Sequence, residues 1–467
     1  MLKNHIKDIL YRHLRFEPTD GQKVLIDTLA EMLCSPSNRQ LALVKGYAGT
    51  GKTSVISAFV RTLNDFRISP VLMAPTGRAA KVLSAYSGEQ AFTIHKKIYR
   101  QKSSADGFGS FVLSFNTCSN TFFIVDEASM ISRYSTDRSL FGNGNLLDDV
   151  LKFVYNDRNC RLILIGDTAQ LPPVGQEESP ALDGNRLEGY GLEIFECELT
   201  EVVRQQQESG ILKNATIVRE LITNGQTGYP SLKTASIADV EHIAGGELID
   251  TINEAYDKYG IDETIVICRS NRQANRYNQG IRNRILYREE ELASGDFLMV
   301  VRNNYHWIKD AENISFIANG DIVRVIRIRK HIERYGFRFA EVDLCLPDYD
   351  NYEFKAIIML DALCSEAASI SEEQNRHLYY SVAEDYAHIP TKAQRYRAIR
   401  EDPFFNALQV KFAYAVTCHK AQGGQWQCVF LDHGWLTDEM LNIEYLRWLY
   451  TAITRASEKL YLVNFRV

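Results

Sequence analysis

The stretch that decides the fold is GYAGTGKT, residues 46–53, which matches the pattern G-x-x-x-x-G-K-[ST]. It follows the apolar run 41–44 (LALV), which is typical of a buried β-strand. Residues 52–63 come next and carry apolar side chains at helical spacing. Between a strand and a helix, this pattern predicts a loop whose glycines let backbone N–H groups surround phosphate oxygens. An ordinary glycine-rich turn is the alternative, and the Lys-Thr pair in register with both elements argues against it.

Similar apolar runs recur along the chain, as buried parallel strands do. In the first half they are residues 71–74, 122–125 and 162–165, and in the second half 264–268, 429–431 and 460–463. About 160 residues separate the first two runs of the second half. That gap holds β-rich segments with a tight-turn dipeptide at Asn319-Gly320, followed by a charged, helical stretch. We therefore expect an α/β fold with two domains, the second of which is interrupted by a β-rich insertion.

The length and composition of the chain limit the number of domains and the classes of protein that it can represent. A chain of 467 residues predicts two or three domains. Its formal net charge of −6 argues against a protein coated in positive charge but permits a local basic groove. No run of about 18 apolar residues is present and charges interrupt the N-terminal stretch, so we expect neither a membrane span nor export. Nine cysteines without a C-x-x-C pair indicate reduced thiols in a cytoplasmic protein and no zinc cluster.

Two adjacent acids, Asp126 and Glu127, end the apolar run 122–125. Beside a phosphate-binding loop, the carboxylate of Asp126 is expected to hold Mg²⁺ together with the hydroxyl of Thr53. Glu127 is the candidate general base on the attacking water, and Lys52 places a cation at the β- and γ-phosphates. The residues thus predict hydrolysis of ATP or GTP.

Three further polar residues complete the expected catalytic set. Gln170 follows the strand 162–165, where its amide could bind the γ-phosphate or the attacking water; a polar strand cap is the alternative. Arg204 and Arg455 are candidates for arginine fingers that stabilise transition-state charge across a cleft. A surface salt bridge is the alternative for each arginine taken alone.

Eight motifs in order resemble those of superfamily 1 helicases, and most of all the 5′→3′ branch with the Dda and RecD helicases. They are GYAGTGKT, APTGRAAK, TIHK, VDEASM, GDTAQLPPV, LTEVVRQ, TCHKAQGGQW and YTAITRA. The resemblance implies two RecA-like P-loop NTPase domains, the second interrupted by a β-rich SH3-like insertion with a helical extension. The implied boundaries are 1–206 for domain 1 with a pin hairpin at about 97–118, 207–290 and 405–467 for domain 2, and 291–404 for the insertion and its helical hook.

The resemblance also implies site residues. The nucleotide set is Gln22, Gly46, Ala48, Gly49, Thr50, Gly51, Lys52, Thr53, Ser54 and Gly424. Gln22 is expected to recognise adenine and so to favour ATP over GTP. Without the resemblance, the better interpretation of Gln22 is an exposed polar residue at the start of a helix. Related chains commonly carry an acid near Gln425, so its departure here argues against a sugar or metal role. The DNA-contacting set is Pro75, Thr76, Thr93, His95, Thr417, His419 and Lys420, with Asn271 and Asn278 as DNA or interdomain contacts.

Two segments are candidates for handling the duplex and the strands. In the expected pin, Phe108 is the wedge candidate, while Phe111 and Phe115 are expected to pack the hairpin onto its domain. The segment 324–338 holds six basic residues and one acid, which is consistent with a DNA channel or with a solvated hairpin.

The expected function is an ATP- and Mg²⁺-dependent DNA helicase that works as a monomer on single-stranded and tailed duplex DNA, 5′→3′, in replication, repair or recombination. A translocase that strips proteins from single-stranded DNA remains an alternative. A small-molecule kinase shares the P-loop but needs no second domain, and intact Glu127 argues against a non-catalytic clamp.

Overall fold

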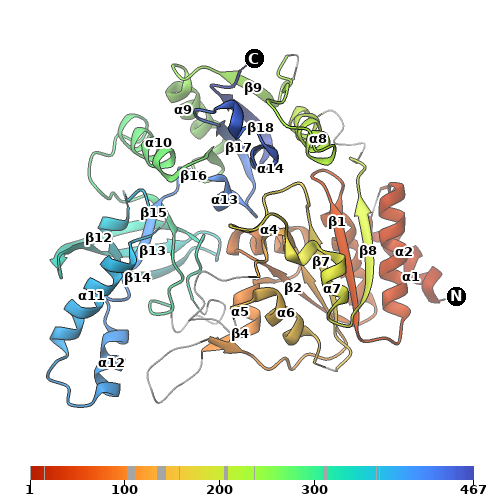
Figure 1. Ribbon diagram of the computed structural model, residues 1–467, viewed down its shortest axis with the longest axis horizontal. Coiled ribbons are helices and arrows are strands. Elements are labelled where there is room, and N and C mark those ends of the chain that lie inside the picture. Colours follow the sequence, from red (N-terminus) through yellow and green to blue (C-terminus); the bar gives the residue numbers. More distant parts are fainter. Residues whose placement is uncertain are drawn as a thin grey trace.

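The structure is a computed structural model. It describes residues 2–14, 16–101, 111–133, 144–156, 158–203, 209–235, 237–308, 314, 316–363, 365–367 and 369–466. Two parallel sheets with helices on their faces lie beside a closed β-barrel (Figure 1). Among the described residues, no helix has the length and apolar character needed to cross a membrane.

Domain 1 contains the first sheet, whose strands are all parallel and run in the order β3-β2-β6-β7-β1-β8. The strands are β1 (Gln40–Gly46), β2 (Ser69–Ala74), β3 (Ala91–Thr93), β6 (Thr121–Val125), β7 (Arg161–Gly166) and β8 (Glu193–Leu199). Its helices are α1 (Leu2–Leu14), α2 (Asp20–Cys34), α3 (Lys52–Asp65), α4 (Gly77–Ser87), α5 (Ile94–Ile98), α6 (Leu146–Val154) and α7 (Gly184–Glu188). Separate apolar clusters cover the two faces, one under α1, α2 and α3 and the other under α5 and α6. The central strands are therefore buried on both sides, which explains their continuous apolar runs.

Domain 2 contains the second parallel sheet, in the order β16-β10-β17-β18-β9. The strands are β9 (Val240–Ile243), β10 (Thr264–Cys268), β16 (Ala415–Thr417), β17 (Trp426–Asp432) and β18 (Ala456–Val463). The helices are α8 (Gly210–Thr223), α9 (Leu248–Tyr259), α10 (Asn271–Arg284), α13 (Cys418–Ala421) and α14 (Ile443–Ile453). Strands β10 and β17 pair although the insertion separates them in sequence, so the mixed α/β fold with parallel sheets is confirmed.

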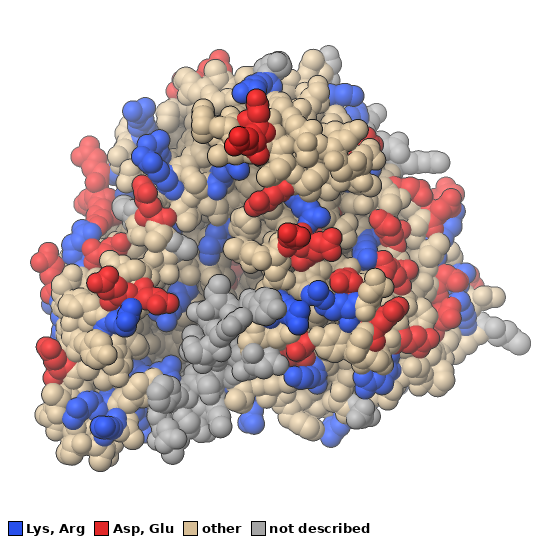
Figure 2. Space-filling view, viewed as in Figure 1, with Lys and Arg blue, Asp and Glu red and all other residues tan. Residues whose placement is uncertain are grey.

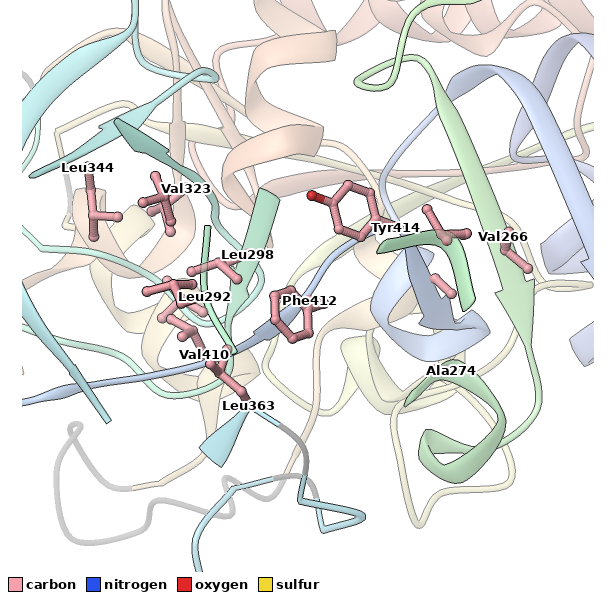
Figure 3. Packing of buried hydrophobic residues seen from close by; sticks show 14 of the residues in the cluster. Val266, Ala274, Leu292, Leu298, Val323, Leu344, Leu363, Val410, Phe412 and Tyr414 are labelled. Atoms are coloured by element: carbon pink, nitrogen blue, oxygen red, sulfur yellow. The ribbon is translucent and has the colours of Figure 1, made fainter. Parts of the chain in front are cut away.

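The β-rich insertion is a closed barrel of β11 (Phe297–Val300), β12 (Ile322–Arg334), β13 (Phe337–Leu346), β14 (Tyr352–Met359) and β15 (Leu408–Phe412). Strand β15 lies past residue 404, the expected end of the insertion, so the insertion extends further than its sequence predicts. Figure 3 shows how Leu298, Val323 and Val410 fill the barrel, while Phe412 and Tyr414 lead toward Val266 in domain 2. One continuous core therefore joins the barrel to domain 2.

The helical extension consists of α11 (Glu372–Asp385) and α12 (Lys392–Glu401), which pack on the barrel through an apolar cluster that includes Phe339 and Leu378. The expected pin has described strands only at its base, β4 (Tyr99–Gln101) and β5 (Phe111–Leu113), which pair antiparallel. Phe108 lies outside the described residues. The expectation that Phe115 packs onto the domain is wrong, because its side chain is 71% exposed and Arg158 lies over its ring.

Candidate nucleotide and nucleic-acid site

The phosphate-binding loop joins β1 to α3, as its sequence predicts. Gly49 and Gly51 have φ values of 75° and 76°, in the left-handed region that favours glycine. Gly51 is the N-cap of α3, so Thr53 and Ser54 lie in the first turn, where backbone N–H groups point toward an anion. The Nζ of Lys52 donates to the carbonyl oxygens of Gly46 at 2.5 Å and Tyr47 at 2.7 Å. The ammonium is thus held at the mouth of the loop.

Gln22 supports this loop from α2. Its side chain is 0% exposed, so the alternative of an exposed helix-start residue is wrong. Its Nε2 donates to the carbonyl of Thr50 at 2.9 Å, and its Oε1 accepts the N–H of Thr19 at 3.1 Å in a capping box. Both ends of the amide therefore have partners within the protein, one of them in the phosphate-binding loop.

The acidic pair lies at the carboxyl end of β6. Glu127 has φ 52°, and its backbone N–H donates to Oδ1 of Asp126 at 2.8 Å. Burial and the neighbouring Glu127 raise the pKa of Asp126 to about 6, against the influence of Lys52 and Arg455. An anionic carboxylate in this place is costly until a cation lies beside it. With the Thr53 hydroxyl it offers the hard oxygen donors that Mg²⁺ prefers, so these residues fit a magnesium ion.

Domain 2 brings Arg455 against the acidic pair. This arginine is buried, and its Nη1 lies 3.7 Å from Oε1 of Glu127. Its Nε donates to the carbonyl of Thr451 at 3.0 Å and its Nη1 to that of Gly424 at 3.1 Å. The carbonyl of Gly424 thus helps to orient the guanidinium. Arg204 lies outside the described residues, but the N–H of Val203 donates to the carbonyl of Gly49 at 3.0 Å.

Gln170 lies in the loop after β7 and is buried. Its Oε1 has no hydrogen-bond partner among the described residues, so this acceptor has capacity left for a group at the site. Domain 2 forms hydrogen bonds with both the N–H and the carbonyl of the following residue, Leu171. Its N–H donates to Oγ1 of Thr451 at 2.8 Å, and its carbonyl accepts Nε2 of Gln422 at 2.7 Å. The position of the Gln170 loop therefore depends on the docking of domain 2.

The first-domain residues expected to contact DNA lie at the ends of β2 and β3. Pro75 follows β2, and the hydroxyls of Thr76 and Thr93 cap α4 and α5. His95 lies in α5 with its ring 5.6 Å from that of Tyr99, and burial lowers its pKa to about 4. His95 is therefore neutral at physiological pH and suited to hydrogen bonding more than to charge.

Their counterparts in domain 2 lie in and before α13. Thr417 is the N-cap of this helix, and burial lowers the pKa of His419. Burial and Lys411 lower the pKa of Lys420 to about 8, and its Nζ donates to Oδ1 of Asn319 in the barrel at 2.5 Å. The two sets approach each other at Gly423, where an added Cβ would lie 3.0 Å from the Thr76 hydroxyl.

Asn278 is not available for DNA. It is buried, and its Nδ2 donates to the carbonyls of Phe412 at 3.1 Å and Ala415 at 2.9 Å. It therefore ties α10 to the crossing between barrel and domain 2, while Asn271 begins that helix. The basic residues of segment 324–338 are all exposed. Arg329, Arg334 and Arg338 form ion pairs with acidic residues of the barrel and its surroundings, which favours the solvated-hairpin reading for those three.

Two family models match the chain, one described as an AAA domain over residues 19–229 and one as a UvrD-like helicase C-terminal domain over residues 412–463. The ATP-dependent DNA helicase dda of Enterobacteria phage T4 is 27% identical over 66% of this chain and 67% of its own. The ATP-dependent RecD2 DNA helicase of Deinococcus radiodurans is 28% identical over 42% of this chain and 24% of its own. The chain belongs to superfamily 1 of the helicases.

Two further comparisons cover nearly the whole of this superfamily 1 helicase. An uncharacterized protein of Acanthamoeba polyphaga mimivirus is 24% identical over 94% of this chain and 98% of its own. A solved structure of two coordinating Pif1 helicases on forked double-stranded DNA has a TM-score of 0.50 at 15% identity, covering 97% of this chain and 93% of that one. That structural likeness concerns the fold. As a member of the superfamily, the enzyme hydrolyses ATP.

Several residues of the helicase interface were missed by sequence reasoning. Arg78 lies 4.2 Å over the ring of Trp426 and donates to the carbonyl of Gln425 at 2.8 Å. Gln422 and Tyr450 of domain 2 also contact domain 1. Arg78, Gln422, Trp426 and Tyr450 belong to the quoted motifs, but the sequence does not indicate their contacts, and only the tertiary structure shows their partners.

Proposed function

We propose that this superfamily 1 DNA helicase moves along single-stranded DNA in the 5′→3′ direction and unwinds duplex DNA at the expense of ATP. The observation that carries the proposal is the approach of Arg455 from domain 2 to Glu127 of domain 1, at 3.7 Å. A hydrolytic site shared between two domains makes the chemistry depend on their relative position, and this dependence is what a motor requires.

In the proposed mechanism, the N–H groups of the loop from Gly46 to Thr53 bind the phosphates, and Lys52 turns from the loop carbonyls to the β- and γ-phosphates. Glu127 takes a proton from the attacking water, and Gln170 orients that water. Arg455, together with Arg204, stabilises charge on the γ-phosphoryl group. Thr53 and Asp126 would hold a magnesium ion, which would neutralise part of the phosphate charge.

Two DNA grips are proposed, one in each domain. Pro75, Thr76, Thr93 and His95 form the first, and Thr417, His419 and Lys420 form the second. Hydroxyls, imidazoles and an amine contact the DNA backbone without reading sequence. Closure and opening of the domains would bring these grips together and apart, so that each ATP advances the chain along one strand.

The remaining parts are proposed to handle the duplex. The hairpin based on β4 and β5 is the separating pin, with Phe108 as the wedge. The barrel corresponds to an SH3-like module, and α11 and α12 to the hook beside it. The domain limits proposed are residues 1–206 for domain 1, residues 207–290 and 413–467 for domain 2, and residues 291–412 for the insertion, because β15 belongs to the barrel.

The proposal is tested by ATPase assays with and without single-stranded DNA, combined with unwinding of duplexes that carry a 5′ or a 3′ tail. We expect strong stimulation of ATP hydrolysis by single-stranded DNA and unwinding of the 5′-tailed duplex. Unwinding of only the 3′-tailed duplex would refute the direction. Stimulation and 5′→3′ movement without strand separation would identify a translocase that displaces bound proteins.

A further inference from the structure

The hydroxyl of Tyr450 joins two loops of domain 1 from its place on helix α14 of domain 2. It accepts the backbone N–H of Ala48 in the phosphate-binding loop at 2.8 Å. It donates to Oδ2 of Asp167, in the loop that carries Gln170, at 2.7 Å. The side chain is 1% exposed, so water does not compete for either bond.

The same side of α14 holds further contacts with domain 1. Thr451 accepts the N–H of Leu171, and Arg447 donates to the carbonyl of Glu177 at 2.9 Å. Arg455 lies in the turn that directly follows α14 and approaches Glu127. Residues spaced by three and four positions share a helix face, so α14 presents Arg447, Tyr450 and Thr451 together. Among them, Tyr450 alone bonds both the phosphate-binding loop and the loop of Gln170.

Removal of the hydroxyl would leave one buried group, the Asp167 carboxylate, and one half-buried group, the Ala48 N–H, short of a partner. Asp167 is buried, and its Oδ1 already accepts the N–H of Ala169 at 2.9 Å, so Tyr450 supplies the partner of its other oxygen. The N–H of Ala48 would also lose its acceptor. Hydrogen bonds to charged, buried groups are among the strongest in proteins, and leaving such groups unpaired is costly. The two loops would therefore relax to other positions.

We propose that Tyr450 is a positioning residue that aligns the phosphate-binding loop with the Gln170 loop only when domain 2 is docked. It thereby makes hydrolysis depend on the domain closure that single-stranded DNA promotes. This inference rests on the proposed function, since it assumes that DNA drives closure. Tyr450 acts through Ala48, Asp167 and the loops that contain them, and not by contact with the nucleotide.

The test is Tyr450→Phe, which removes one oxygen and keeps the ring. The matched control is Tyr445→Phe in the same helix, since the Tyr445 side chain is also buried and its hydroxyl has no hydrogen-bond partner in the part of the chain described. We measure kcat and KM for ATP with saturating oligo-dT and without DNA. Tyr450→Phe should lower the DNA-stimulated kcat roughly tenfold or more, with KM and the DNA-free rate changed less than about threefold. Tyr445→Phe should remain close to wild type.

A second variant, Asp167→Asn, shows whether the loss passes through this hydrogen bond. The double variant with Tyr450→Phe should lose no more kcat than the more damaged single variant. The inference is overturned if Tyr450→Phe keeps wild-type stimulation, if its rates with and without DNA fall equally, or if the two losses multiply. A wild-type enzyme that single-stranded DNA does not stimulate would instead refute the proposed function itself.

Discussion

Lys52 illustrates how a single side chain is held ready by its own loop. Its ammonium is bound by the carbonyls of Gly46 and Tyr47, and an added Cβ at Gly46 would lie 2.9 Å from Cδ of Lys52. Packing of this kind confines the lysine to the mouth of the phosphate-binding loop. Lys52 is the first residue of α3, whereas the proposed DNA grips belong to other elements, so phosphate binding and DNA binding are assigned to different residues.

Lys52→Ala should therefore abolish ATP hydrolysis, by roughly a hundredfold or more, because the phosphates lose their cation. The affinity for single-stranded DNA without nucleotide should stay within about threefold of wild type, as measured by fluorescence anisotropy. Lys23→Ala, an exposed lysine of α2, serves as the control. Loss of DNA binding together with ATPase in Lys52→Ala would contradict the division of labour between loop and grips.

Asp321 is a buried carboxylate where the barrel meets domain 1. An added Cβ at Gly77, the first residue of α4, would lie 2.5 Å from its Oδ1. The carboxylate accepts the N–H of Ala318 at 2.7 Å and the hydroxyl of Tyr349 at 3.3 Å. Burial raises its pKa from 3.8 to about 7, and the nearby charge of Asp348, itself paired with Lys81, adds to the shift.

Because the folded pKa is above the unfolded value, the folded chain holds this proton more tightly between pH 4 and 7. The stability contributed by the protonated group is complete below the unfolded pKa and is lost as the pH rises to about 7. Asp321→Asn should remove this pH dependence of the free energy of unfolding. The dependence amounts to at most about 1.4 kcal/mol per pH unit between pH 4 and pH 7. Urea denaturation of both chains at pH 5 and pH 8 measures the difference. Asp350→Asn, at an exposed position, should behave as wild type, and an unchanged slope in Asp321→Asn would contradict the expectation.

At the scale of elements, the helical extension depends on apolar packing against the barrel. Leu378 of α11 is 2% exposed and lies in the cluster with Phe339 and Met359. An ion pair between Arg334 of β12 and Asp385 lies at the exposed end of the same helix and contributes little. The position of α11 and α12 is thus decided by burial, which their highly charged sequence does not reveal.

Leu378→Ala should loosen α11 and α12 from the barrel, at a cost of about 2–5 kcal/mol for a buried leucine. Hydrogen exchange should rise in residues 372–401, while DNA-stimulated ATPase is kept, because the ATP site lies in other domains. Tyr380→Ala in the same helix is the control, since that side chain is 65% exposed. Unchanged exchange in Leu378→Ala would show that the cluster does not hold the extension.

At the scale of the whole molecule, two features matter: the distribution of surface charge and the contacts between domain 1 and domain 2. Figure 2 shows basic and acidic side chains interspersed over the visible face, so the net charge of −6 is not spread as one acidic field. Domain 1 meets domain 2 through α14 and also through Arg78, which stacks on Trp426 near the proposed DNA grips. Contacts near the ATP site and near the grips therefore belong to the same interface.

Arg78→Ala should weaken domain closure, since it removes both the stacking and the hydrogen bond to Gln425. We expect the concentration of oligo-dT that gives half-maximal ATPase to rise about threefold to tenfold. The DNA-free rate should change little. Arg67→Ala, at an exposed arginine elsewhere in domain 1, controls for the loss of one positive charge. Equal effects of the two variants would assign the role of Arg78 to general electrostatics.

The amino-acid sequence by itself determined the phosphate-binding loop, the acidic pair, the parallel strands and the presence of a β-rich insertion. Each of these depends on local order: glycines and a Lys-Thr pair between a strand and a helix, or an apolar run buried on both faces. Because neighbouring residues determine such features, the sequence predicts them without knowledge of what packs against them.

Only the tertiary structure decided the closure of the barrel by β15, the structural role of Asn278, the exposure of Phe115 and the partners of Tyr450. Ala48 and Tyr450 are separated by 402 positions, and Gln422 and Leu171 by 251. A hydrogen bond between such residues depends on how whole domains pack, because the bond forms only after both backbones have been placed. No local pattern of side chains encodes that distance or direction.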